Sequence, residues 1–277
     1  MNVALTILIT ASASLVAIAG ILLVRRNAPD GSYFHDGDRA AGVFGVLATG
    51  FSVLLGFVVF LAFESYDNSR SGAETEALVL AQQFQTAQHL PLEVRDRLGG
   101  ELVCYARSVV YREWPRMESG TEGDALNPWG VALFRTLRDV EPEVPSEEAA
   151  YGKWLDQASD REAGRMQRIH AAEGVIPGPL WMVLIAVAVL IFVFMLFFAD
   201  SGETAAVQGL MMGAVVTVMV LMLLIIGFLN HPFRPGFGSL QPRSMERTLE
   251  ILEEERTIVN DDDPLPCDED GESLSQD

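Results

Sequence analysis

Four long apolar stretches constrain the fold of this 277-residue chain more than any other feature of its sequence. A helix of about 20 apolar residues crosses the hydrocarbon core of a bilayer, and each stretch reaches that length without an Asp, Glu, Lys or Arg. One such charge at mid-span would cost about 2.5–3.5 kcal/mol. Because backbone groups in lipid must be hydrogen-bonded internally, we expect helices. The stretches comprise residues 1–24, 42–63, 179–198 and 205–229.

The sequence therefore predicts an all-α membrane protein with four transmembrane helices. The first stretch could be mistaken for a cleaved signal peptide. It lacks a basic region ahead of its apolar run, and that run continues through Val24. We expect it to be a retained membrane anchor.

Acidic residues are concentrated outside the spans. The formal net charge is -19, yet the mean hydropathy is +0.24, so apolar and charged residues must be segregated along the chain. Residues 245–277 hold thirteen acidic residues and two arginines. This balance argues against a nucleic-acid partner, because binding phosphates needs a basic face.

The acidic segment 244–277 is predicted to be a mostly disordered tail. One short amphipathic helix is expected from Ser244 through Arg256, and the Asp-, Glu-, Pro- and Ser-rich remainder has little to bury. Its acidic runs lack the ligand spacing of a calcium-binding loop. No metal site and no cofactor are predicted.

The distribution of arginines predicts the orientation in the membrane. With the N-terminus inside, three arginines (Arg25, Arg26 and Arg39) fall on the outer side. Seven then flank the spans on the cytoplasmic side, although the pair Arg25-Arg26 argues for the opposite orientation. We expect both termini and residues 66–178 to be cytoplasmic. The seven are Arg70, Arg161, Arg165, Arg168, Arg234, Arg243 and Arg247.

Residues 66–178 are predicted to form a helical cytoplasmic domain between spans two and three. Apolar residues such as Ala77, Leu80 and Phe84 recur at spacings of three and four, which is the helical period. Pro115 is expected to end or kink one helix, and a last helix is expected to start at Ser146. We expect this domain to continue spans two and three directly.

The two cysteines, Cys104 and Cys267, lie far apart in the sequence. They cannot form a disulfide framework or a zinc site by spacing. The expectation is that both are reduced in the cytoplasm.

Enzyme motifs are lacking. The four histidines are scattered, and the chain has no nucleophile elbow, no P-loop and no dinucleotide-binding glycine motif. We therefore do not expect an enzyme.

Span two carries a seam of small and hydroxyl residues, which continues to Phe63. Spacings of three and four place them on one helix face. One interpretation is close helix packing, because small residues let backbones approach. The other is the wall of a pore, in which hydroxyls and exposed backbone replace part of an ion's hydration shell. The seam comprises Gly42, Gly45, Thr49, Ser52, Gly56 and Phe63.

Arg161, Arg165 and Arg168 share one face of the last cytoplasmic helix. They are candidates for anion or lipid contacts, because a ring of them across subunits would attract anions. The alternative is salt bridging to neighbouring acids such as Glu101 or Glu113.

A set of short motifs is distributed along the chain outside the first span and the tail. The motifs are Tyr105, Glu113-Trp114-Pro115, Arg161, Arg165, Ile176-Pro177, Leu180-Trp181 and Leu229-Asn230-His231-Pro232-Phe233. They resemble those of an uncharacterised bacterial membrane-protein family labelled bestrophin-like. The resemblance runs from about residue 42 to residue 242, and the family often has Asp at the position of Asn230.

The resemblance extends more distantly to bestrophins, and it implies a function. Bestrophins are pentameric ion channels, mostly for anions, with four spans per subunit, cytoplasmic termini and a pore lined by the second span. We accordingly expect a homo-oligomer in the bacterial plasma membrane, embedded in the lipid bilayer and conducting inorganic ions. The alternative is a non-conducting membrane scaffold that recruits a cytoplasmic partner.

Overall fold

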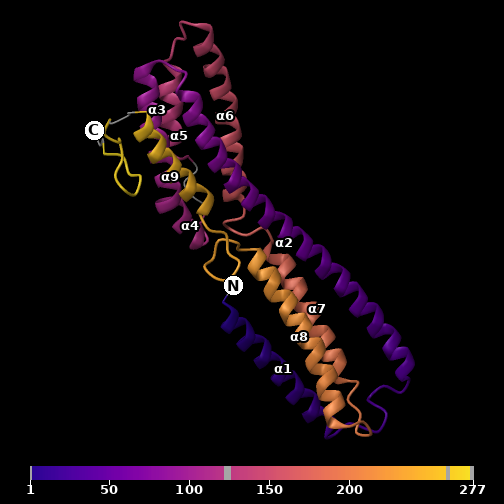
Figure 1. Cartoon of the computed structure of the whole chain (residues 1–277). Coiled ribbons are helices and arrows are strands. Elements are labelled where there is room, and N and C mark those ends of the chain that lie inside the picture. The colour runs from indigo at the N-terminus through magenta and orange to yellow at the C-terminus, as the bar shows by residue number, and fades with distance from the viewer. Residues whose placement is uncertain (1, 122–125, 260–262, 275–277) are drawn as a thin grey trace. The chain divides into compact units, whose positions relative to one another are not determined.

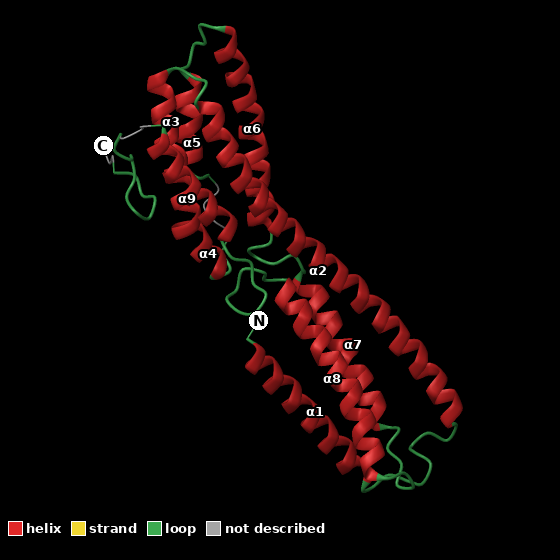
Figure 2. Ribbon diagram, viewed as in Figure 1, coloured by secondary structure: helices red, strands yellow, loops and turns green. Residues whose placement is uncertain are grey.

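The computed structural model describes residues 2–121, 126–259 and 263–274. Helices are the regular elements of these residues, and no strand occurs among them (Figure 2). The chain divides into two compact units. The first contains the apolar helices up to Ser65 and from Val175 to Asn230, and the second contains most of the remaining chain.

The four predicted apolar stretches are helical in the structure. Four helices are long and apolar enough to cross a membrane (Figure 1). Helices α7 and α8 start within one residue of the predicted boundaries, and α1 ends within one residue of the expected end. The four helices are α1 (Val3–Arg25), α2 (Gly37–Ala87), α7 (Gly178–Leu196) and α8 (Ala205–Leu229).

Helix α2 continues without a break for 51 residues. At a rise of 1.5 Å per residue it is about 75 Å long, more than twice the roughly 30 Å of a hydrocarbon core. The helix that contains span two is therefore much longer than a membrane crossing requires. Span three does not continue directly from the preceding helix, because α6 (Pro145–His170) ends eight residues before α7 begins. Gly174 adopts a φ of +92° in the connection, and Pro177 precedes α7, where its lack of an N–H is tolerated.

Glycines of α8 let α1 pack closely against it. A Cβ at Gly213 would lie 3.0 Å from Cδ1 of Ile18, and one at Gly209 would lie 3.4 Å from Cγ2 of the same residue. The hydroxyls of Ser14 and Thr217 hydrogen-bond at 2.8 Å across the same helix pair. This is the small-residue packing expected between membrane helices.

Helix α3 (Leu92–Ser108) lies at the centre of the second unit, and most of its residues from Leu98 onward are buried. Helices α5 (Pro128–Arg138) and α9 (Arg243–Ile258) pack against it (Figure 1). Its apolar core includes Phe84, Tyr105 and Trp154. The core therefore combines segments that lie far apart in the sequence.

A π-helical turn interrupts the helix after α3. It spans Val109–Glu113 and is called the π segment below. Helix α4 (Trp114–Glu118) follows, with Pro115 in its first turn. A proline cannot donate a helical hydrogen bond, and its ring crowds the carbonyl four residues earlier. The wider π turn accommodates Pro115, so the predicted interruption takes the form of a π segment rather than a chain break.

Helices α2 and α6 touch through their backbones. A Cβ at Gly72 would lie 2.6 Å from the carbonyl oxygen of Gly164, and one at Gly164 would lie 2.8 Å from the amide nitrogen of Glu76. The Ser69 hydroxyl donates to the Gln167 carbonyl at 3.2 Å nearby. Glycine is therefore required at both positions for the helices to approach this closely.

The expectation for Cys104 and Cys267 was wrong, because the two form a disulfide with a Cα–Cα distance of 5.8 Å. Their separation of 163 residues says nothing about their distance after folding.

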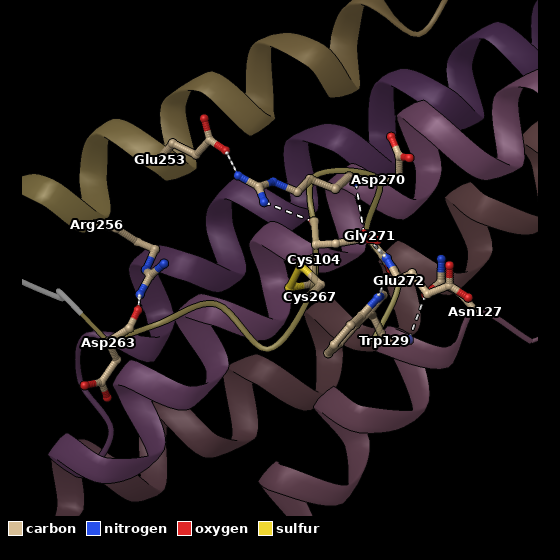
Figure 3. Close-up of a disulfide and its surroundings, with 12 residues drawn as sticks. Cys104, Asn127, Trp129, Glu253, Arg256, Asp263, Cys267, Asp270, Gly271 and Glu272 are labelled. Carbon is tan, nitrogen blue, oxygen red and sulfur yellow. Dashed lines mark hydrogen bonds and ion pairs between the residues drawn. A yellow bond between two sulfur atoms is a disulfide. The ribbon is translucent and has the colours of Figure 1, made fainter. Parts of the chain in front are cut away.

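The prediction of a mostly disordered tail also fails for the described residues. Helix α9 is longer than expected, and residues 263–274 lie against α3 with Cys267 and Gly271 buried (Figure 3). Composition missed this because a disulfide and hydrogen bonds hold the segment. Residues 260–262 and 275–277 lie outside the described residues.

The glycine contact makes a stability prediction. Gly72→Ala and Gly164→Ala should each destabilise the protein by about 1–3 kcal/mol, because the added methyl overlaps backbone that cannot move aside. Gly152→Ala, also in α6, is the matched control. Nothing lies within 4 Å of its Cβ position, and it should stabilise by roughly 0.5–1 kcal/mol. Thermal unfolding midpoints in detergent would test this. A Gly72→Ala protein as stable as wild type would contradict the described contact.

Candidate functional site: the exposed face of α2 and a buried charge cluster

All six residues of the α2 seam are exposed in the structure. Apart from neighbouring turns of α2 itself, no described atom lies within 4 Å of the Cβ positions of Gly42, Gly45 or Gly56. Among the described residues the seam therefore does not serve packing, in contrast to the glycines of α8.

Another face of α2 packs within the unit. Phe51, Leu55 and Val58 are buried in one cluster with Leu184 and Ile191 of α7. Large side chains thus hold α2 in place. The small residues lie where the folded chain leaves the helix uncovered.

The exposed side of α2 is itself divided into two strips. Val46, Val53 and Phe57 are exposed large apolar residues, and the helical period of 3.6 places them beside the seam rather than on it. Large apolar side chains suit contact with lipid tails. Glycine, Thr49 and Ser52 leave backbone and hydroxyl oxygens accessible.

The phenylalanines of span two do not share one environment. Phe51 is buried, and Phe44 stacks on Phe194 with ring centroids 5.8 Å apart. Phe57, Phe60 and Phe63 are exposed. Of the five rings, only Phe63 lies on the seam.

The hydroxyl of Ser52 donates a hydrogen bond within its own helix. It donates to the Ala48 carbonyl at 2.8 Å, so in this rotamer it presents only oxygen lone pairs outward. An acceptor of this kind suits cations or water better than it suits anions.

Arg165 and Arg168 are fully buried, and Arg161 is nearly so. Arg168 binds Glu76 through two hydrogen bonds of 2.5 and 3.0 Å and binds Glu113 at 2.6 Å. Arg165 binds Glu113 at 3.1 Å. The four residues Glu76, Glu113, Arg165 and Arg168 are called the charge cluster below. They join α2, α6 and the π segment.

Arg161 lies beside the charge cluster. It donates to the side-chain oxygen of Gln83 at 2.7 Å. Its guanidinium carbon lies over the Tyr105 ring, 5.0 Å from the ring centroid. The structure thus brings the three predicted arginines together, and their contacts are with side chains of the second unit.

Two neutral side chains complete the hydrogen bonding of the carboxylates. The Tyr105 hydroxyl donates to Glu76 at 2.7 Å, and the Asn127 amide donates to Glu113 at 2.9 Å. Burial, together with the charge of Glu76, raises the pKa of Tyr105 well above its ordinary value. The phenol therefore stays protonated as a donor.

The carboxyl of Glu113 stays ionised in this environment. Burial by itself would raise the pKa of Glu113, but the charges of Arg168 and Arg165 and the hydrogen bonds hold this pKa below its ordinary value. Two arginines face two glutamates, so the formal charges of the cluster balance.

Sequence analysis identified only part of this cluster. The predicted alternative of pairing with Glu113 is confirmed, whereas Glu101 instead binds Arg97 and Thr136. Glu76 was missed. Its signal was an acid within the apolar helical stripe of Ala77 and Leu80, which marks a buried charge that needs a partner.

The charge cluster makes a second stability prediction. Arg168→Gln should cost about 3–5 kcal/mol, because it leaves two buried carboxylates without their shared cation. Arg70→Gln removes an exposed ion pair with Glu74 at 3.1 Å and should change stability by less than about 1 kcal/mol. Chemical denaturation in detergent would measure both. Equal effects of the two substitutions would show that the cluster does not stabilise the fold.

Comparisons with known proteins agree with this architecture. A family model described as a bestrophin-like domain matches residues 9–245. No curated protein matches significantly.

Solved membrane proteins share the fold. A point mutant of a bacterial bestrophin homologue from Klebsiella pneumoniae matches with a TM-score of 0.60 at 14% identity, over 93% of this chain and 99% of that one. A crystal structure described only as that of a membrane protein, also a point mutant, matches with a TM-score of 0.65 at 14% identity, over 94% and 98% of the two chains. A second structure with that description, carrying a different substitution, matches with a TM-score of 0.62 at 15% identity, over 91% and 97%.

Proposed function

Since the chain belongs to the bestrophin-like family, whose model matches residues 9–245, we propose that it is the subunit of an oligomeric ion channel in the bacterial plasma membrane. The observation that carries this proposal is the exposed seam of α2. Six small, hydroxyl or terminal aromatic positions share a face that no other described part of the subunit covers. Several copies arranged with this face inward would enclose a passage.

A passage needs more than one copy of the chain. Apolar side chains fill much of the space between the helices of the first unit. Its cavity of about 480 Å³, lined in part by Asp200, Glu203 and Gln208, lies beside the first turns of α8. We therefore place the route between subunits rather than within one. In a ring, the glycines would leave room for water, and Thr49 and Ser52 would supply oxygens that replace part of an ion's hydration shell. The resemblance to bestrophins favours a ring of five.

The buried arginines do not supply an anion preference. Arg165 and Arg168 are engaged with Glu76 and Glu113, so they are poor candidates for an anion-attracting ring. We therefore assign ion conduction to the seam and assign no anion preference to the arginines. Reversal potentials in a chloride gradient would measure the preference directly.

We propose that the second unit and both termini are cytoplasmic, as the excess of arginines on that side favours. Ser71 and Ser201 are exposed on segments that this orientation places on opposite sides. In a background without native cysteines, Ser201→Cys should react with an impermeant thiol reagent on intact cells and Ser71→Cys should not. The reverse pattern would invert the proposed orientation.

Cysteine modification during conduction tests the seam. Purified protein in planar bilayers should conduct, and a charged thiol reagent should change the current of Ser52→Cys, because the added charge would lie in the passage. Phe57→Cys, on the lipid-facing strip, is the matched control and should keep its current. Both variants lack Cys104 and Cys267.

Two outcomes would contradict this account. A change of current in Phe57→Cys but not in Ser52→Cys would place the passage on another face of α2. No conductance from a verified oligomer would instead support the alternative of a membrane scaffold.

A further inference from the structure

The Cys104–Cys267 disulfide attaches the end of the described chain to the core of the second unit. Residues 263–274 are called the C-terminal strap below. Cys104 lies in the middle of α3 and is fully buried, and Cys267 is 4% exposed. We propose that this cysteine pair is a redox-modification site: its disulfide holds the strap on α3, and a small thiol that reduces the disulfide releases the strap.

The strap buries little surface of its own. Cys267 and Gly271 are its buried residues, whereas Leu265, Pro266 and Asp268 are half-buried and the other described positions are exposed. Ordering a segment costs conformational entropy at every residue. With so few apolar contacts to offset that cost, the strap depends on its covalent link.

Polar contacts direct the strap to its place. The Trp129 indole donates to the Gly271 carbonyl at 2.7 Å (Figure 3). Arg107 donates to the Asp268 carbonyl at 3.1 Å. The ion pair of Arg112 with Glu272, at 3.3 Å, is partly exposed to solvent on both sides. Contacts of this kind fix the register, but solvent competes for them once the strap can move.

Like charges oppose docking of the strap. Glu269 and Asp270 line a surface cavity of about 640 Å³ together with acids of α9, and Arg107 is the single basic residue among the described residues that line it. Carboxylates that share a cavity repel one another. The disulfide holds the strap against this repulsion. The acids of α9 in the cavity are Glu246, Glu250 and Glu253.

The exchange reaction is ordinary thiol–disulfide chemistry. Because both sulfurs are buried, the strap must open locally before a thiolate reaches Cys267. Attack at the Cys267 sulfur forms a mixed disulfide and breaks the protein S–S bond, with Cys104 leaving as a thiolate that takes up a proton. A second small thiol then releases Cys267 as a thiol. Overall, two small thiols are oxidised to one disulfide and the protein disulfide is reduced to two thiols.

A cytoplasmic setting would supply the small thiols. Disulfides in that compartment are usually transient or redox-sensing rather than permanent. This step alone rests on the proposed orientation, and the exchange reaction can be tested without conduction.

Release of the strap is expected to affect the π segment, which lies next to it. A Cβ at Gly271 would overlap the backbone of Ser108, so the strap rests directly on the backbone that precedes the π segment. Asn127 hydrogen-bonds both the Ser108 hydroxyl, at 3.4 Å, and Glu113 of the charge cluster. Reduction is therefore expected to loosen the π segment as well as the strap.

Hydrogen exchange on full-length protein in detergent tests the proposal, with oxidised and reduced glutathione as the probes. Alkylation and intact mass should show no free thiol per chain in the oxidised buffer and two in the reduced one, reversibly. Amides of residues 263–274 should exchange about tenfold faster or more after reduction, and amides of the π segment should follow in the same direction. Cys267→Ser should show the fast exchange in both buffers. Leu274→Ala, at an exposed strap residue outside the acidic cavity, keeps both cysteines and should respond as wild type does.

Four results would overturn the proposal. Equal protection of the strap in both buffers would show that the disulfide does not hold it. Thiols that never pair in the oxidised buffer, or a disulfide that glutathione never reduces, would remove the reversible site. A glutathione response in Cys267→Ser would assign the effect to another part of the protein. None of these results depends on whether the protein conducts ions.

Discussion

Hydrocarbon offers no hydrogen-bond partner to a peptide group, and this constraint organises the whole chain. It requires helices wherever the sequence enters lipid, and it excludes charges from four stretches of about 20 residues. Within that constraint, two kinds of side-chain packing hold the helices together. Large apolar residues join α2 to α7, and glycines of α8 admit α1. The small residues of α2 are then left uncovered, because neither kind of packing uses them.

In the second unit, buried charges are balanced by charges of the opposite sign. Arg168 is completely buried, yet two glutamates and a backbone-to-backbone crossing at Gly72 and Gly164 hold its surroundings in place. A buried cation without partners would be expensive, whereas this one has its charge balanced. The same residues that suggested an anion site from their spacing are thus explained by the packing of α2, α6 and the π segment.

Sequence reasoning succeeded where a single physical rule governs the outcome. Apolar length determined the four spans, and helical periodicity determined most of the second unit. It failed where distant residues meet. Cys104 and Cys267 are separated by 163 residues in the sequence. Glu76 and Arg168, which form an ion pair, are separated by 92 residues. The strap was predicted to be disordered because composition counts apolar residues and cannot anticipate a disulfide. The break before α7 was missed because the cytoplasmic domain was expected to continue span three directly, whereas α6 ends at His170 and α7 begins at Gly178.

The central claim is that copies of this chain meet with the seam of α2 facing inward. Native mass spectrometry of the full-length protein, released from detergent or nanodiscs, tests it most directly because it counts the subunits. The account predicts one closed assembly of more than two copies, with five favoured by the family. A protein that is monomeric at every concentration at which it stays folded would contradict the account, since the exposed seam would then face lipid alone.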